Sequence, residues 1–396
     1  MADTSTIEWT DSTWNPITGC TLVSEGCRHC YAATLAATRL KNHPSRKGLA
    51  RINAAGEAKF TGEVRFNEQW IDQPLRWKRP RMIFVCAHGD LFHEAVPDEW
   101  IDRVFAVMAL AQQHTFQVLT KRPERARAYL VSRNTSVPGD MITNTAFGMN
   151  CRVRGYRGIG GSATWPLPNV WLGTSIEDQA TADARIPHLL ATPAAVRFVS
   201  AEPLLGPVYL TRVGNFQSVT SAFPELVERL RRHMRPHTIS GVQIEAVGSR
   251  YQATTFYQTP DHMGGFEVGS REYPRLNWVI VGGESGRNAR PMHPDWARSL
   301  RDQCVAAGVA FFFKQWGAWV PWEMGSAPMW NAQNGASEDG NWLFPSDMDA
   351  DATWDDGLAH YEPGRTEHCA FQSVGKKAAG RLLDGRVWNQ MPGVVA

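Results

Sequence analysis

The chain has 396 residues, of which 43% are hydrophobic and 20% charged, and its formal net charge is +2. This composition is typical of a soluble globular protein that buries its core in one large or two ordinary domains. We find neither the roughly 18 apolar residues that a membrane span needs nor the basic and apolar start of a signal peptide, so we expect a cytoplasmic protein with no membrane partner.

The first chemical signal along the chain is WNPITGCTLVSEGCRHCYA, in which Cys20, Cys27 and Cys30 form C-x6-C-x2-C. In a reducing compartment, such a cluster indicates metal binding or catalysis rather than disulfides. A structural zinc ion would need a fourth ligand, for which His29 and two later histidines, His88 and His93, are candidates. A [4Fe–4S] cluster on three cysteines instead has one iron free to bind a small molecule. We favour the cluster, with zinc or unliganded thiols as alternatives.

Six short apolar segments after this loop predict buried strands of a parallel sheet. They are MIFVCA (82–87), FQVLT (116–120), NVWLGTS (169–175), VRFVSAE (196–202), NWVIVGGE (277–284) and VAFFFKQ (309–315). Apolar residues at helical spacing predict helices over 99–113 and 295–308. The succession indicates an α/β fold, a partial (β/α) TIM-like barrel of about six or seven parallel strands.

Polar residues follow five of these strands, where a barrel of this kind carries its active site. They are His88-Gly89-Asp90, Thr120-Lys121-Arg122, Ser175-Ile176-Glu177-Asp178, Ser200-Ala201-Glu202 and Gly283-Glu284-Ser285. One shared site explains all five, although each group alone also suits an ordinary turn or helix cap.

Three stretches, 134–168, 211–275 and 323–372, are rich in turn-forming residues and longer than usual barrel loops. We therefore predict a barrel over 1–322 with insertions at 134–168 and 211–275, and a C-terminal extension over 323–396 that packs on it. Basic residues gather at 39–51, 76–81, 121–127 and 228–235. Each group suits either a phosphate-binding surface or a solvated face.

Several segments resemble the signature stretches of a known family. They are WNPITGC, DLFHEAVP, LTKRPER, GTSIEDQ, SAEPLLGP, VGGESGRNARPMHPDW, FFFKQWG and GRLLDGRVWNQMP. The family is phage-encoded and bacterial and is similar to radical S-adenosylmethionine (SAM) enzymes, whose common cysteine spacing, C-x3-C-x2-C, is three residues shorter in its first gap. The resemblance implies a radical SAM type of barrel, a [4Fe–4S] cluster, and reductive cleavage of SAM to methionine and a 5′-deoxyadenosyl radical. It also implies a one-electron donor such as flavodoxin or ferredoxin.

The resemblance assigns the cluster to Cys20, Cys27 and Cys30 and places His29 beside the adenine of SAM. The segment after the second strand of such a barrel contacts the methionine amino group, which here implies Gly89 and Asp90 together with His88. A literal Gly-Gly-Glu ends at Glu284, but because it follows a late strand we expect Glu284 to face the substrate or to cap a turn instead.

Further roles follow from position along the predicted strands. Lys121 suits the SAM carboxylate as a point charge on a long stem. Ser175 and Glu177 suit the ribose hydroxyls, since a carboxylate accepts two hydrogen bonds from a diol. Glu202 suits the adenosine or the substrate. Cys86 suits hydrogen-atom donation to a substrate radical, or packing as a small hydrophobe.

The basic segments and the abundant tryptophans favour a nucleic acid or nucleotide substrate, with base modification or DNA repair as the reaction. A base in a duplex must be flipped out before chemistry can reach it, and Trp316, Trp319 and Trp322 are candidates for stacking on it. The alternatives are a nucleic-acid-binding protein with a structural iron–sulfur cluster and a zinc-stabilised protein.

Overall fold

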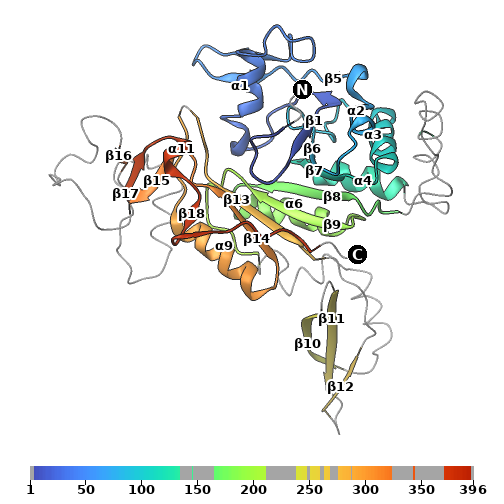
Figure 1. Ribbon diagram of the computed structural model, residues 1–396. Helices are drawn as coiled ribbons and strands as arrows, with labels where there is room; N and C mark the ends of the chain where they lie inside the picture. The colour runs from blue at the N-terminus through green and yellow to red at the C-terminus, as the bar shows by residue number, and fades with distance from the viewer. Residues whose placement is uncertain are drawn as a thin grey trace, which may run out of the picture.

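The computed structural model describes residues 4–133, 145, 165–210, 238–247, 250–258, 263–267, 275–286, 288–322, 342–343 and 370–393. Its main feature is a parallel seven-stranded sheet in the order β1-β6-β7-β8-β9-β13-β14, so that neighbouring strands follow one another along the chain (Figure 1). Helices connect most of the successive strands. This arrangement is a partial (β/α) barrel.

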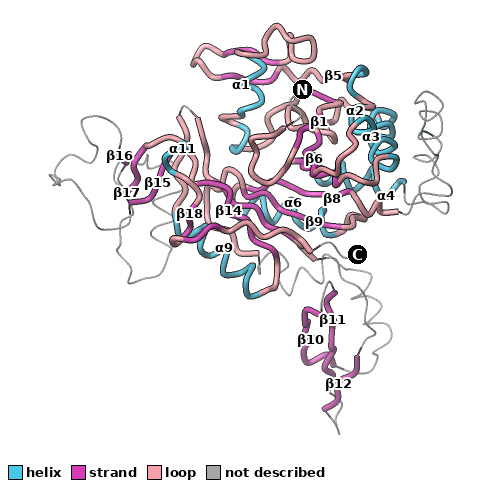
Figure 2. Tube along the Cα trace, in the orientation of Figure 1, coloured by secondary structure: helices cyan, strands magenta, loops and turns pink. Residues whose placement is uncertain are grey.

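The strands of the main sheet are β1 (Ser12–Trp14), β6 (Met82–Val85), β7 (Thr115–Thr120), β8 (Val170–Ile176), β9 (Val196–Ala201), β13 (Trp278–Gly282) and β14 (Ala310–Gln315). The helices are α1 (Tyr31–Ala37), α2 (Gln73–Arg76), α3 (Asp98–Leu110), α4 (Pro123–Arg133), α6 (Gln179–Leu190), α9 (Pro294–Ala306) and α11 (Lys376–Ala379), with 3₁₀ turns η1 (Glu25–Cys27) and η2 (Glu68–Trp70). Figure 2 shows how these helices and strands alternate.

Five smaller sheets accompany the main sheet among the described residues. β2 (Ile17–Thr18) pairs with β5 (Arg65–Phe66), β3 (Ala50–Ile52) with β4 (Ala58–Phe60), and β18 (Leu382–Leu383) with β19 (Arg386–Val387). β10 (Thr238–Val247), β11 (Arg250–Gln258) and β12 (Met263–Glu267) form an antiparallel sheet within the predicted insertion at 211–275. β15 (Trp319–Trp322) and β16 (Trp342–Leu343) both pair with β17 (Ala370–Ser373).

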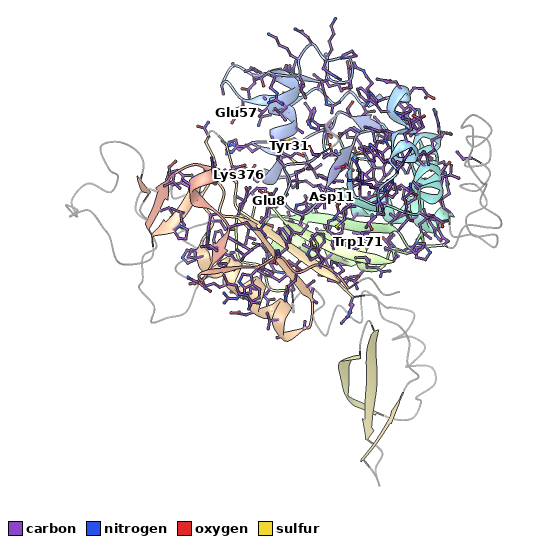
Figure 3. All side chains as sticks on the ribbon, in the orientation of Figure 1. Glu8, Asp11, Tyr31, Glu57, Trp171 and Lys376 are labelled. Carbon is purple, nitrogen blue, oxygen red and sulfur yellow. The ribbon has the colours of Figure 1, made fainter. Side chains whose placement is uncertain are left out.

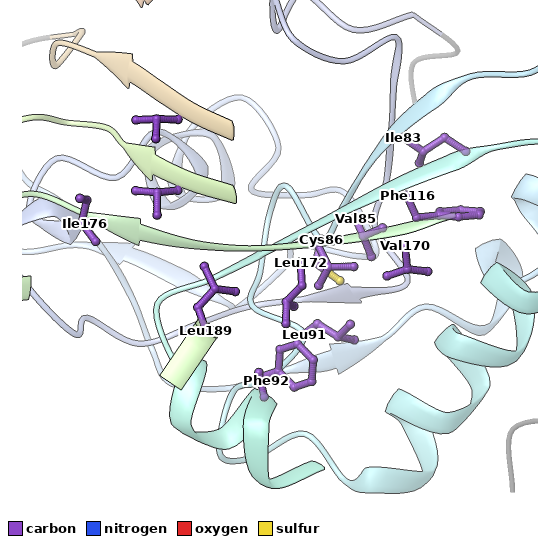
Figure 4. Packing of buried hydrophobic residues seen from close by; sticks show 14 of the residues in the cluster. Ile83, Val85, Cys86, Leu91, Phe92, Phe116, Val170, Leu172, Ile176 and Leu189 are labelled. Carbon is purple, nitrogen blue, oxygen red and sulfur yellow. The ribbon is translucent and has the colours of Figure 1, made fainter. Parts of the chain in front are cut away.

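Alternation along the strands divides the core between the two faces of the sheet. On the helix-covered face, side chains such as Ile83 and Val85 of β6 pack with α3 residues in one large cluster (Figure 4). On the other face, Phe84 belongs to a mainly aromatic cluster with Trp171, Phe198, Trp278 and Phe312, among others. The same alternation places Ser175 of β8 and Ser200 of β9 on the face of this aromatic cluster, in line with Trp171 and Phe198.

All six predicted strands and both predicted helices are confirmed, with ends shifted by three residues or fewer. The sequence reading missed β1, because its three residues, STW, form no apolar run. It was also wrong to extend the second strand through Cys86: β6 ends at Val85, and Cys86 has a φ of 57°, in the left-handed region. The strand therefore ends at Val85, and the backbone turns sharply at Cys86.

The C-terminal residues 370–393 pack against the barrel. Phe313 N donates to Trp388 O (2.9 Å), Gln390 N donates to Phe311 O (3.1 Å), and Leu383 is fully buried. Within the described ranges, we find no helix long and apolar enough to cross a membrane.

Candidate functional site

The cysteine loop lies between β2 and α1, beside the carboxyl ends of the first strands. Cys20 follows β2, Cys27 ends η1, and Cys30 precedes the first residue of α1. All three thiols are free and partly exposed. Burial raises the pKa of Cys20 to about 12 and also raises the pKa of Cys30, and in both cases the neighbouring Cys27 adds to the shift. Thiolates at these positions therefore need compensating positive charge.

Arg122, which follows β7, supplies such a charge beside Cys20. Its Nη1 lies 3.6 Å from Cys20 Sγ, and the same atom donates to Asp90 Oδ2 (3.1 Å). Its Nη2 donates to Thr21 Oγ1 (2.5 Å), and its Nε donates to Glu94 Oε1 (2.8 Å). The guanidinium thus joins the first residues of the cysteine loop to the turn that follows β6.

Asp90 is one of the predicted SAM contacts, and its buried carboxylate is used within the protein. Its oxygens accept from Thr120 Oγ1 (2.8 Å), Phe92 N (2.9 Å) and Lys121 N (3.2 Å) in addition to Arg122. Through these bonds, Asp90 holds together the ends of β6 and β7, the two neighbouring strands that face the cysteine loop.

Gly89 permits a close approach between the turn after β6 and the cysteine loop. A Cβ atom at Gly89 would lie 3.0 Å from Ile17 O and 3.1 Å from Gly19 O, both of them backbone atoms. Gly19 N in turn donates to His88 O (3.1 Å). A side chain here would push the cysteine loop away from the sheet.

Glu177, after β8, lies directly beneath the cysteine loop and is 1% exposed. It forms an ion pair with Lys121 Nζ, and it accepts from Arg185 Nη1 and Ser24 Oγ, each at 2.9 Å. A Cβ atom at Gly26 would lie only 2.4 Å from Glu177 Cγ, which shows how closely the loop covers this carboxylate. Burial lowers the pKa of Lys121 to about 8.

A second anchor of the loop comes from the far end of the chain. Glu284, after β13, lies with its Oε2 3.1 Å from His29 Nδ1 and accepts from Arg290 N (2.8 Å) and Nε (2.9 Å). Arg290 Nη2 also donates to Glu25 O (3.0 Å). Although burial alone would raise it, the pKa of Glu284 is lowered by the hydrogen bonds and charge of Arg290 and by His29. We call these three side chains, His29, Glu284 and Arg290, the clasp.

Glu202, after β9, belongs to the opposite half of the sheet. Lys314 Nζ donates to its Oε1 (2.5 Å), and Gln315 Nε2 approaches the same oxygen at 3.3 Å. Its side chain is 19% exposed. Of the predicted cofactor carboxylates, it is the most accessible, because those of Glu177 and Asp90 are 1% and 7% exposed. Ser175, on β8, is buried.

Cys86 lies in the core rather than at the site surface. It is 3% exposed and packs among Val85, Leu91 and their neighbours (Figure 4), and burial raises its pKa to about 12. Cys86 therefore packs in the core as a small hydrophobic residue. The proposed role in hydrogen-atom donation stays a prediction.

The candidate zinc ligands lie in separate environments. His93 Nε2 is 3.0 Å from Thr21 Oγ1, and His29 lies against Glu284. The ring of His88 packs edge-on against Tyr31, with 6.0 Å between ring centroids, and burial lowers its pKa to about 3. Among the described residues, no group of three His, Cys, Asp or Glu side chains is arranged to hold a single metal ion.

The predicted stacking tryptophans contribute to packing where their side chains are described. Trp316 is 5% exposed and donates to Leu382 O (2.8 Å), and Trp319 donates to Ala289 O (2.6 Å). The prediction that Trp316 stacks on a base is therefore wrong, because its ring is buried. The side chain of Trp322 and the basic segment 228–235 lie outside the described residues.

The structure thus brings the three cysteines together with Asp90, Lys121, Glu177 and Glu284, and places Glu202 with Lys314. Sequence reasoning did not single out Ser24, Arg185 or Arg290, which fix the loop and Glu177. No local pattern marks them, because their partners lie up to 265 residues away along the chain.

Residues 4–392 match the model of a family described as Protein of unknown function (DUF5131). The chain belongs to this family. No curated protein and no solved structure matches it. The resemblance to radical SAM enzymes stays a prediction.

Proposed function

We propose that this protein is a radical SAM enzyme that holds a [4Fe–4S] cluster on Cys20, Cys27 and Cys30. The observation that carries the proposal is a loop with three partly exposed cysteines at the carboxyl ends of a parallel half-barrel, with the Arg122 guanidinium 3.6 Å from one sulfur. A cluster places its thiolates on separate irons, so it does not need them to converge on one ion as zinc does.

The charges around the loop suit such a group. Three thiolates carry negative charge that burial disfavours, and Arg122 and Lys121 lie close enough to offset it. The chemistry that a reduced cluster supplies to bound SAM is cleavage of a sulfonium carbon–sulfur bond, giving methionine and a 5′-deoxyadenosyl radical. The chain's own task is to hold both cofactors and exclude water.

The hydrogen bonds support separate roles for the predicted cofactor residues, some in positioning cations and others in binding ligand hydroxyl groups. Asp90 and Glu177 already accept several hydrogen bonds from the protein, so we assign to them the positioning of Arg122 and Lys121. Glu202 is more exposed, and we assign to it the hydroxyl groups of the adenosine or the substrate. We keep a nucleic acid base as the proposed substrate class, supported by the basic segments of the sequence.

The test is anaerobic reconstitution with iron and sulfide, followed by dithionite and SAM, with 5′-deoxyadenosine measured by chromatography. The wild type should form it and Cys27→Ala should not. Cys304→Ala is the matched control, because Cys304 is a buried cysteine of α9. A brown wild type that never forms 5′-deoxyadenosine would favour a structural cluster, and a colourless protein that retains zinc would favour the zinc alternative.

A further inference from the structure

The cysteine loop exposes two adjacent aliphatic side chains. Leu22 is 58% exposed and Val23 is 41% exposed, and both lie in the six-residue gap between Cys20 and Cys27. Large apolar side chains exposed next to each other and next to a functional loop mark an interaction site more often than isolated ones do. Both residues belong to the same loop as the cysteines.

Hydrogen bonds on both sides hold these residues in place. Thr21 Oγ1 is bound by Arg122 Nη2 (2.5 Å) and lies 3.0 Å from His93 Nε2, and Ser24 Oγ donates to the buried Glu177 (2.9 Å). Because the flanking residues are anchored inward, Leu22 and Val23 face outward on a fixed backbone. Such preorganisation lowers the entropic cost of binding.

Basic side chains lie on the same cysteine loop and on the β3–β4 hairpin bonded to it. Lys59 Nζ donates to Arg28 O (2.9 Å), which ties the β3–β4 hairpin to the cysteine loop, and Arg51 pairs with Lys59 across the hairpin. Paired residues of an antiparallel hairpin share a face, so Arg51 lies on the same side as Lys59. Arg28 and Arg51 are exposed. We call Leu22, Val23, Arg28, Arg51 and Lys59 the loop patch.

The segment that contains the loop patch carries a net positive charge, even though Glu57 pairs with Lys59 (3.3 Å) and Arg28 (3.8 Å). Residues 22–65 contain eight Lys and Arg residues against three acidic ones, a net charge of +5, whereas the entire chain carries +2. The rest of the chain is therefore slightly acidic. Figure 1 shows α1 and the neighbouring hairpin together at one end of the molecule, where Figure 3 labels Glu57, one of the few acidic residues there. A field of this kind steers negatively charged partners to the loop.

We propose that the loop patch docks an acidic protein that carries a one-electron carrier. The inference rests on the proposed function, since the electron is needed only if the cysteines hold a cluster. An aliphatic centre with a charged rim is the anatomy of a protein–protein interface. A surface for single-stranded nucleic acid would combine basic residues with aromatic side chains for stacking. The two exposed central residues here are aliphatic, and the hydroxyl of the half-exposed Tyr31, next to Cys30, is bound to Ala87 O (2.6 Å). In the transfer, a donor's anionic flavin hydroquinone loses one electron to become the neutral semiquinone, and the cluster gains that electron.

The experiment compares two reductants on the reconstituted protein. A bacterial flavodoxin in its hydroquinone form must dock, whereas dithionite reduces without a docking surface. The rate of cluster bleaching is followed by anaerobic stopped flow for the wild type, for Leu22→Ser/Val23→Ser and for Arg51→Glu. Val305→Ser and Lys377→Glu are matched controls, because both residues are exposed and lie on helices α9 and α11 of the C-terminal part.

Both loop-patch variants should be reduced by flavodoxin about tenfold more slowly than the wild type at low salt, with unchanged rates for dithionite. The wild-type flavodoxin rate should fall with added salt, and both controls should behave as the wild type. Equal flavodoxin rates in patch and control variants, or no reduction by flavodoxin where dithionite succeeds, would overturn the docking inference alone.

Two further outcomes also count against the inference. A patch variant that loses binding of a single-stranded oligonucleotide while keeping its flavodoxin rate would assign the surface to nucleic acid. A wild type in which neither reductant bleaches a cluster would overturn the proposed function and the docking inference together.

Discussion

At the scale of single residues, the site depends on a buried cation with several partners. Arg122 contacts Cys20, Thr21, Asp90 and Glu94 at once, and its side chain is 6% exposed. Removing one member of a buried ion pair leaves the other charge without compensation, which costs more than the loss of an exposed pair. Arg122 therefore stabilises the fold as well as the cysteine loop.

We predict that Arg122→Gln lowers the free energy of unfolding of the apoprotein by about 3 kcal/mol, because Asp90 then stays buried beside a neutral amide. Urea denaturation measures the change. Arg28→Gln is the control, since the Arg28 side chain is 55% exposed and its ion pairs are long, so its effect should be within about 0.5 kcal/mol. Similar losses in the two variants would contradict the argument.

At the scale of elements, the sequence predicts most strands of the main sheet and two helices, but not the contacts between residues far apart in the chain. The six apolar strands and two helices could be predicted because burial and periodicity are local properties of the sequence. β1 was not predicted, because an edge strand of three residues is too short to show an alternating apolar pattern. The cysteine loop could be predicted from thiol spacing alone, whereas the clasp could not, because Glu284 meets His29 across 255 residues.

The contact between the turns after β13 and β14 gives a prediction at this scale. A Cβ atom at Gly283 would lie 1.9 Å from Trp316 O and 2.7 Å from Trp316 C, and both are backbone atoms that no rotamer change can move. We predict that Gly283→Ala destabilises the protein by about 2 kcal/mol or more and loosens the adjacent clasp.

Differential scanning calorimetry of the apoprotein measures this loss as a fall in melting temperature. Gly393→Ala is the matched control, because among the described residues no atom lies within 4 Å of a Cβ added there. An unchanged melting temperature in Gly283→Ala would show that the two turns do not pack as described.

At the scale of the whole molecule, the partly buried His88 makes stability depend on pH. Burial lowers the pKa of His88 from its ordinary value of 6.5 to about 3, so the unfolded chain takes up a proton in this range while the folded protein does not. Stability then falls as the pH decreases from about 6.5 toward 3, by at most about 1.4 kcal/mol per pH unit for one such group.

We predict that His88→Gln flattens this dependence, because glutamine does not titrate. Urea midpoints measured between pH 4 and pH 7 should fall less steeply for the variant than for the wild type. Identical slopes would mean that His88 gains access to water and protons in the folded state.

The clasp also has a consequence for the order of biosynthesis. The cysteines are made within the first tenth of the chain, but Glu284 and Arg290, which anchor His29 and Glu25 of their loop, are made only after more than two thirds of it. A nascent chain that has emerged only as far as β9 therefore presents its thiols on a loop without this anchor. Complete fixation of the loop must follow translation of residue 290, so under the proposed function the cluster enters the finished site late in synthesis.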